Sequence, residues 1–179
     1  MTAYSLDLIY GSLGAMTLDP SAREGLKPAD QRFLKIIEEQ GWCVTIVAPR
    51  VGEEGQLFAY STGLYYTYEH PEIILFNLES KTLHNAINAV GKRVQAREIF
   101  QPNKAYQGIS DDRECQFRVV HGSHYREYLG WSIWFYQNLD FPVMQAFWPD
   151  EENHFPWDEY GDGWIRQTQP LLYEELPSA

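Results

Sequence analysis

The segment AYSTGL, residues 59–64, gathers three hydroxyl side chains beside a glycine, and this combination could bind a ligand. Tyr60, Ser61 and Thr62 would exchange hydrogen bonds with a bound molecule, and Gly63 would let it approach the backbone closely. A structural alternative uses the same residues, because threonine suits a strand and a glycine within a strand also marks a bulge. The sequence alone leaves both interpretations open.

A histidine flanked by acids follows in the segment EHPE. His70 titrates near neutral pH, so beside Glu69 or Glu72 it could act as a general base. Pro71 instead favours an extended residue before it, and therefore a turn whose acids face solvent. Adjacency in sequence establishes no catalytic geometry, so the turn is the preferred interpretation, with His70 kept as a candidate ligand contact.

The third candidate lies near the carboxyl end, in MQAFWPDEENHFPWDEYGDGW, residues 144–164. Aromatic rings alternate there with prolines and acids, which predicts a stiff strap with its rings packed inward and its carboxylates in water. The segment QPLL, residues 169–172, would clasp the end of this strap. The same strap could also wall a pocket, whose polar and aromatic contacts would come from five side chains: Gln145, Trp148, Asp150, Trp157 and Gln169.

Other kinds of reaction centre are not supported by residue spacing. His121, His124 and His154 do not follow a metal-ligand spacing, so no metal site is predicted. The sequence has no G-x-S-x-G nucleophile elbow. Cys43 and Cys115 lie within predicted strands, where reduced, buried thiols are expected.

Charge is concentrated at the carboxyl end of the 179-residue chain, whose formal net charge is -11. From Asp150 onward there are eight acids and one base, Arg166. Such an arm repels phosphate backbones, which excludes nucleic acid as a partner, and it suits a basic protein. Solubility alone would also explain it. No apolar run is long enough for a membrane helix, and the first residues lack the features of a signal peptide, so a cytoplasmic location is expected.

Hydrophobic periodicity divides the first half of the chain into clear elements. Residues 27–41 are predicted to form a helix with Pro28 in its first turn and Gly41 at its end. Residues 42–62 have the pattern of a β-hairpin. Residues 70–78 form an apolar run typical of a central strand covered on both faces. A second helix is predicted from Ser80 to Gly91.

The second half continues with two predicted strands, 92–98 and 115–121, joined by a polar loop. A third helix is expected over 123–138 and a last strand over 141–149. The pattern predicts an α+β fold, with a mainly antiparallel sheet or a small split-barrel-like barrel, about three helices and an irregular C-terminal strap. Residues 1–26 would be an extension on a single domain, 27–179, that includes the acidic arm, 149–179.

Six short segments occur in an order that resembles a known family: FAYSTGL, HPEIILFNL, the helix ending at Gly91, QAFWPD, FPW and QPLL. This order resembles domain of unknown function 4262, a bacterial family typified by a YTxGL segment, a following hPEl strand and a closing series of W-P-D, f-P-W and Q-P-L-L. The resemblance covers about residues 41–172 and implies no established chemistry. One departure is that Ser61 separates Tyr60 from Thr62.

A weaker resemblance is to the flavin-binding split-barrel reductases, in which a hydroxyl-rich strand and a helix amino terminus commonly hold the flavin. It implies FMN as a cofactor and a homodimer, with the flavin contacts falling on five residues: Ser61, Thr62, Ser80, Lys81 and Thr82. Free N–H groups at a helix start do bind phosphate. The hydroxyl-rich strand, however, carries no cluster of basic residues.

These observations favour a binding domain. Its partner would be a small molecule beneath the strap or a basic protein on the acidic arm, as in a toxin-neutralising immunity protein. The alternative is an FMN-dependent oxidoreductase, in which the flavin would supply the redox chemistry. A hydrolase built on His70 rests on the fewest residues.

Overall fold

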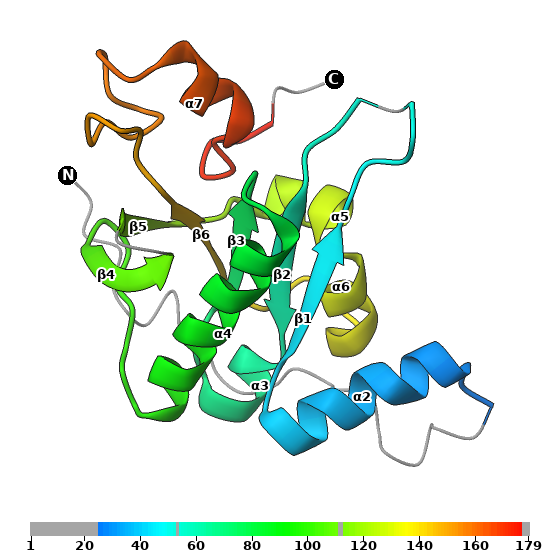
Figure 1. The fold of residues 1–179 in the computed structure, drawn as a ribbon. Helices are drawn as coiled ribbons and strands as arrows, with labels where there is room; N and C mark the ends of the chain where they lie inside the picture. The colour runs from blue at the N-terminus through cyan, green and yellow to red at the C-terminus, as the bar shows by residue number, and fades with distance from the viewer. Residues whose placement is uncertain (1–24, 53, 111–112, 177–179) are drawn as a thin grey trace.

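One six-stranded sheet organises the chain in the computed structural model, which describes residues 25–52, 54–110 and 113–176 (Figure 1). The strands are β1 (Cys43–Val47), β2 (Phe58–Thr62), β3 (Glu72–Phe76), β4 (Ala105–Ser110), β5 (Arg113–Val119) and β6 (Val143–Phe147). Their order is β1-β2-β3-β6-β5-β4, and neighbours are antiparallel except for β3 and β6, which are parallel. The predicted α+β class and antiparallel sheet are confirmed. The barrel alternative is wrong for the described residues, because β6 inserts beside β3 and leaves β1 and β4 at opposite edges.

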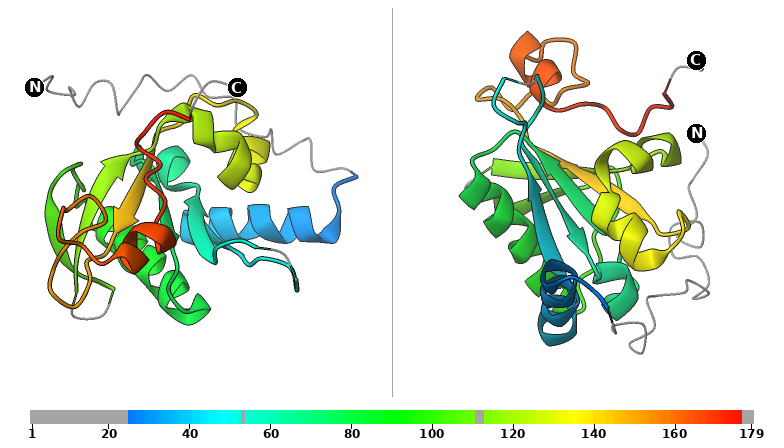
Figure 2. Two further views of the ribbon diagram at one scale, coloured as in Figure 1. Left: turned by 90° about the horizontal axis from the view of Figure 1, so that it is seen from above. Right: turned by 90° about the vertical axis from the view of Figure 1, so that its right-hand side faces the viewer.

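Helices cover both faces of this sheet. They are α2 (Pro28–Gln40), α3 (Leu64–Tyr68), α4 (Ser80–Gln95), α5 (Tyr125–Tyr128), α6 (Gly130–Tyr136) and α7 (Gly163–Thr168), with a 3₁₀ turn, η2 (Gly122–His124). α4 packs on one face, while α2, α5 and α6 contribute to the core on the other. The right-hand view of Figure 2 shows α4 and the α5–α6 pair on opposite sides of the sheet. Two hydrophobic cores therefore share the sheet as a common wall.

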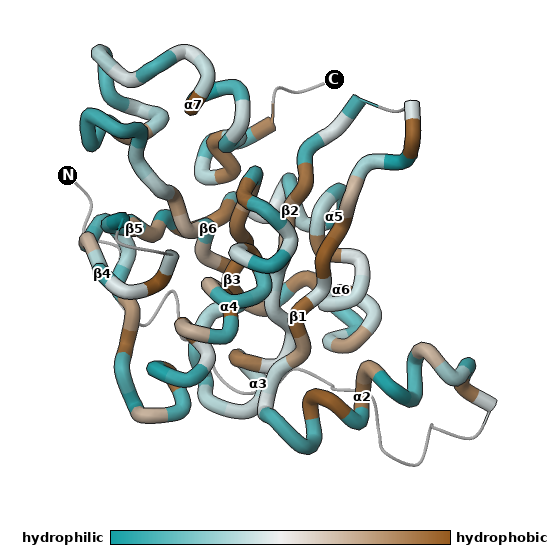
Figure 3. Tube along the Cα trace, in the orientation of Figure 1, coloured by the Kyte–Doolittle hydropathy of each residue, from teal (hydrophilic) through white to brown (hydrophobic). Residues whose placement is uncertain are grey.

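The first helix and the central strand form as their sequences predict. α2 begins at Pro28 and ends at Gln40, and Gly41 caps it with a left-handed φ of 92° and an N–H that donates to the Ile37 carbonyl at 2.7 Å. All five residues of β3, Glu72–Phe76, are buried. The expectation of a strand covered on both faces is confirmed, because residues of β3 belong to both hydrophobic cores. In Figure 3 brown, hydrophobic stretches occur along β1 and β3, whereas the strap is mainly teal to white.

The second predicted helix is longer than expected. α4 does not stop at Gly91 but runs to Gln95, because Val94 lies one turn beyond Val90 and both are buried in the core. Gly91 is needed for packing instead: a Cβ there would come within 2.4 Å of the Trp42 ring. The predicted strand over 92–98 is therefore wrong, since most of it belongs to this helix.

Several further elements differ from the expectation. β4 lies in what was predicted as a polar loop, because its pairing with β5 outweighs its polar and largely exposed residues. The single helix over 123–138 is broken into α5 and α6 around Leu129, where the Trp131 N–H donates to the Tyr60 hydroxyl at 3.1 Å. Short α3 and α7 were not anticipated.

The strap, residues 148–172, leaves the end of β6. In the view of Figure 1 it lies above the sheet. It is irregular apart from α7, as predicted. Nearly all of the predicted extension, residues 1–26, lies outside the described residues. Within residues 25–52, 54–110 and 113–176, no helix is both long and apolar enough to span a membrane.

Candidate functional site

The hydroxyl-rich segment and the acid of the HPE segment meet at one buried carboxylate. Glu72, fully buried at the start of β3, accepts hydrogen bonds from the Ser61 hydroxyl at 2.5 Å and from the Gly63 and Tyr65 N–H groups at 2.7 and 3.2 Å. The Tyr136 hydroxyl of α6 donates to the same carboxylate. Four donors from three elements thus converge on Glu72. An ionised carboxylate has enough lone pairs to accept all four hydrogen bonds.

This network is sealed from solvent. Burial raises the pKa of Glu72, and the surrounding donors from Ser61, Tyr136 and the backbone oppose that rise. The Ser61 hydroxyl is further occupied by accepting from the Ile73 N–H at 2.9 Å. Gly63, at φ 113°, fits closely against α2, since a Cβ there would lie 2.8 Å from the Gly41 carbonyl. The Glu72 network therefore joins β2, β3 and α6 through hydrogen bonds.

The remaining hydroxyls of the segment are also committed internally. Thr62 and Ser132 hold their hydroxyl oxygens 2.7 Å apart in the core. Tyr60 is 1% exposed and accepts from Trp131. Tyr60, Ser61 and Thr62 thus bond to other buried groups of the protein.

The two halves of the predicted flavin contact do not come together. Ser61 and Thr62 lie at the end of β2 that faces Glu72, whereas α4 begins beyond Phe76, at the opposite end of β3. Ser80, Lys81 and Thr82 form the first turn of α4 there. The antiparallel register therefore places the hydroxyls and the helix amino terminus apart, and this arrangement gives the flavin alternative no support.

Two buried glutamines hold the strap in place: Gln145 joins its end to β6, and Gln169 joins its end to its beginning. Gln145 on β6 donates to the Pro170 carbonyl at 2.7 Å and accepts from the Leu172 N–H at 3.1 Å. Gln169 in turn accepts from the Trp148 N–H at 3.0 Å and donates to the Trp148 carbonyl at 2.8 Å. Each amide both donates to and accepts from the main chain, which meets the requirement of a buried glutamine for hydrogen-bond partners. The predicted clasp at 169–172 forms through these bonds.

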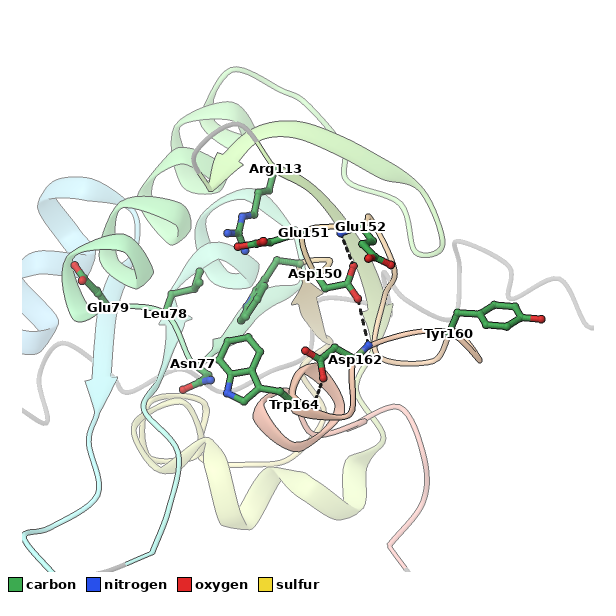
Figure 4. Close-up of a pocket in the computed structure, with 11 residues that line it drawn as sticks. Asn77, Leu78, Glu79, Arg113, Asp150, Glu151, Glu152, Tyr160, Asp162 and Trp164 are labelled. Atoms are coloured by element: carbon green, nitrogen blue, oxygen red, sulfur yellow. Dashed lines mark hydrogen bonds between the residues drawn. The ribbon is translucent and has the colours of Figure 1, made fainter.

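A pocket of about 660 Å³ opens between the strap, the start of α4 and β5 (Figure 4). Trp148 is 2% exposed and its indole N–H donates to the Phe76 carbonyl at 3.0 Å, so its ring is fixed at the base. Trp164, 53% exposed, lies beside it at a ring distance of 5.8 Å. The pocket's lining is Asn77, Leu78, Glu79, Arg113, Trp148, Asp150, Glu151, Glu152, Tyr160, Asp162 and Trp164.

Five of these lining residues are acids and Arg113 is the only base among them. Asp150 organises the wall: it accepts from the His154 N–H at 2.8 Å, the Glu152 N–H at 2.9 Å and the Asp162 N–H at 3.2 Å. The His154 bond first, and then the others, lower the pKa of Asp150, which keeps it ionised. The guanidinium of Arg113 lies 5.7 Å from the centre of the Trp148 ring. The pocket therefore combines an excess of negative charge with indole surface.

Trp157 lies outside this pocket's lining. It stacks on Phe155 at 4.9 Å and covers the Arg118 guanidinium at 3.7 Å, which Tyr173 flanks at 4.6 Å. These contacts are the inward packing that the strap prediction describes. His70 lies elsewhere again, at the start of β3 on the wall of a separate pocket.

Sites for metal or reactive thiols are not assembled in the described part of the chain. No group of three or more His, Cys, Asp and Glu residues is placed there to hold a metal ion. Cys43 and Cys115 are buried free cysteines, and burial raises the pKa of their thiols to about 11 and about 12. Both remain protonated at neutral pH, which makes them poor nucleophiles.

A family model described as Domain of unknown function (DUF4262) matches residues 36–161, well over half of the chain. The chain belongs to the DUF4262 family. The resemblance seen in the sequence is thereby confirmed, although the match ends before Trp164 and the QPLL segment. Neither the curated proteins nor the solved structures include a match. The DUF4262 match covers the Glu72 network, His70 and most of the pocket wall.

Sequence reasoning missed the centre of the network and most of the pocket, since only Trp148 and Asp150 of the five predicted pocket contacts line it. Glu72 was considered only as a neighbour of His70, yet an acid at the start of a strand buried on both faces must have internal donors. That requirement was a usable signal for Glu72. Glu79 and Arg113 gave no comparable signal, because only the sheet topology brings them opposite the strap.

Proposed function

We propose that this DUF4262 protein is a binding module whose strap pocket takes a positively charged group, carried by a small organic cation or by a basic side chain of a partner protein. The observation that supports it is the pocket lining, in which five acids and one base surround two indole rings. Carboxylates and aromatic faces together are the partners that ammonium and guanidinium groups prefer.

The geometry inside the pocket supports a cation more than an anion. Arg113 already lies over the ring of Trp148, so a cation of the protein itself makes the kind of cation–π contact that is proposed for the ligand. Trp164 is 53% exposed and leaves a second indole accessible. An anionic ligand would face the ionised Asp150 and its neighbours, and the chain's net charge of -11 would slow its approach.

The test is isothermal titration calorimetry with two probes, spermidine and an arginine-rich hexapeptide, each at low and at physiological salt. The pocket variant replaces three acids that make no hydrogen bond through their carboxylates in the described structure, so that folding is spared: Glu79→Gln, Glu151→Gln and Glu152→Gln. Its control removes as many charges from the same arm outside the pocket: Glu159→Gln, Glu174→Gln and Glu175→Gln. We expect the pocket variant to bind about tenfold more weakly and the control less than about twofold.

The indole contribution is tested separately with Trp164→Ala, which should weaken either probe about threefold, as expected for an exposed cation–π contact. Binding of spermidine with displacement of the peptide would identify a small cation as the natural source of charge. Binding of the peptide alone would identify a partner protein. Equal losses in the two triple variants would mean that only long-range charge acts, and failure of both probes to bind wild-type protein would also reject the proposal.

A further inference from the structure

A second pocket, of about 410 Å³, lies at the other end of α4 from the strap. It is formed by the end of α3, the connection from α3 to β3, Val94 in the last turn of α4 and the following loop to Gln101. α4 has 16 residues, so its two ends are roughly 24 Å apart. No residue lines both pockets. The two sites can therefore be tested independently.

His70 is the unusual residue of this pocket. It is 2% exposed, and its Nδ1 lies 2.8 Å from the Pro71 carbonyl oxygen. A carbonyl only accepts, so Nδ1 carries the proton and Nε2 presents a lone pair. Nε2 is buried and has no hydrogen-bond partner among the described residues. A buried acceptor without a donor is rare enough to need an explanation, and the adjoining pocket offers one.

The other groups around His70 limit what could bind there. Phe100 meets the imidazole edge-on at 5.7 Å, and Ile99, 57% exposed, adds an apolar wall. Glu98 is held by a two-bond ion pair with Arg93, at 2.6 Å for each bond, which neutralises its charge. The surface of this pocket is thus mainly apolar, and its charged lining residues are Glu69, Arg97 and Glu98.

Burial lowers the pKa of His70 to about 4, so the imidazole is neutral at physiological pH. A base this weak is poorly matched to proton abstraction near pH 7. The general-base role considered for His70 is therefore less suited to this environment than a hydrogen-bond acceptor role.

We propose that this pocket binds a small uncharged molecule, about the size of one aromatic ring, through a hydroxyl or N–H group that donates to His70 Nε2. The apolar walls contact the body of the molecule, and the imidazole selects for the donor. The competing occupant is a single buried water on Nε2, which the experiment distinguishes.

The experiment compares two probes that differ in one donor, 4-methylphenol and 4-methylanisole, by NMR of the full chain labelled with ¹⁵N-histidine. We expect 4-methylphenol to shift the Nε2 resonance of His70 and to bind about fivefold more tightly than 4-methylanisole, as the loss of one hydrogen bond requires. Equal binding of the two probes would overturn the proposal. A bound probe that leaves Nε2 unshifted would assign that nitrogen to a water.

Two variants locate the effect. His70→Phe removes the acceptor while keeping a ring and should abolish the preference for the phenol, whereas His84→Phe, at an exposed histidine on α4, should not. Because His70→Phe changes a buried residue, Ile99→Ala serves as a second variant at a largely exposed position. It should weaken both probes equally and leave their ratio unchanged. Unaltered binding of both probes in Ile99→Ala and His70→Phe would place them elsewhere.

Discussion

Two carboxylates of this protein are held in similar ways and have opposite properties. Glu72 in the sheet and Asp150 in the strap each accept hydrogen bonds from at least two main-chain N–H groups. Glu72 is 0% exposed and burial raises its pKa, whereas the Asp150 side chain is 14% exposed and its hydrogen bonds lower its pKa. Contact with water decides the difference, because desolvation penalises only the charged form.

The difference separates a structural region from a region suited to binding. The acid in the core is buried and accepts its hydrogen bonds from β2, the start of α3 and α6, so it stabilises the fold and is not available to a ligand. The acid in the strap shapes a loop and still contributes charge to a pocket. Residues of the DUF4262 match therefore lie in two different environments, and a cluster of motif residues is not by itself evidence of a ligand site.

The strongest test of this contrast is Glu72→Leu. The substitution leaves the donors of Ser61, Gly63, Tyr65 and Tyr136 buried without their acceptor, at about 1–3 kcal/mol each. We expect the free energy of unfolding to fall by at least about 4 kcal/mol, a large part of the stability of a typical domain. Urea denaturation followed by circular dichroism measures it. Tyr136→Phe is the control, since it removes one of the four donors to Glu72, along with the bond from the Tyr66 N–H, and should cost about 1–2 kcal/mol. A Glu72→Leu protein of nearly wild-type stability would contradict the structural role.

A pH dependence sharpens the comparison through His70, which is buried in its neutral form. The unfolded chain binds a proton at this histidine below about pH 6.5, but the folded protein does so only below about pH 4. Between these values the unfolded state holds more protons, so stability falls as the pH is lowered from 6.5 to 4, by up to about 3 kcal/mol. Glu72 acts in the opposite direction, because its raised pKa favours the folded state at low pH.

The contribution of His70 is isolated by measuring urea denaturation at several pH values in wild type and in His70→Phe. The variant should lose most of the decline between pH 6.5 and 4, while His84→Phe should keep it. A decline of the same size in His70→Phe would assign it to other groups.

The smallest effect on global stability is expected from Asp150→Ala. The change releases the N–H groups of Glu152, His154 and Asp162, which lie in the strap and not in the sheet. Amide hydrogen exchange should therefore accelerate at these three positions while the amides of β3 remain protected. Glu152→Ala is the matched control, because its side chain is 83% exposed. Loss of protection across the sheet would mean that strap and core unfold together.

Much of the fold could be predicted from local sequence, and the exceptions have identifiable causes. α2, the β1–β2 hairpin, β3 and β6 follow from apolar periodicity and from the proline and glycine at the ends of α2. The strand expected at 92–98 failed because Val94 continues the buried stripe of α4. Gly91 suggested a helix end, but the nearby ring of Trp42, distant in sequence, determines the need for glycine there. A contact of that kind leaves no local pattern.

The sequence by itself determined the α+β class, the acidic aromatic strap, the clasp at 169–172 and the family. These depend on composition, on periodicity and on motifs that are continuous in the chain. Only the tertiary structure decided that Ser61 and Thr62 bond inside the protein, that Gln145 and Gln169 hold the strap, and that His70 and Trp148 line two different pockets. The physical reason is that a polar side chain takes the partner that burial and sheet register bring to it, and both are set by residues far away in sequence.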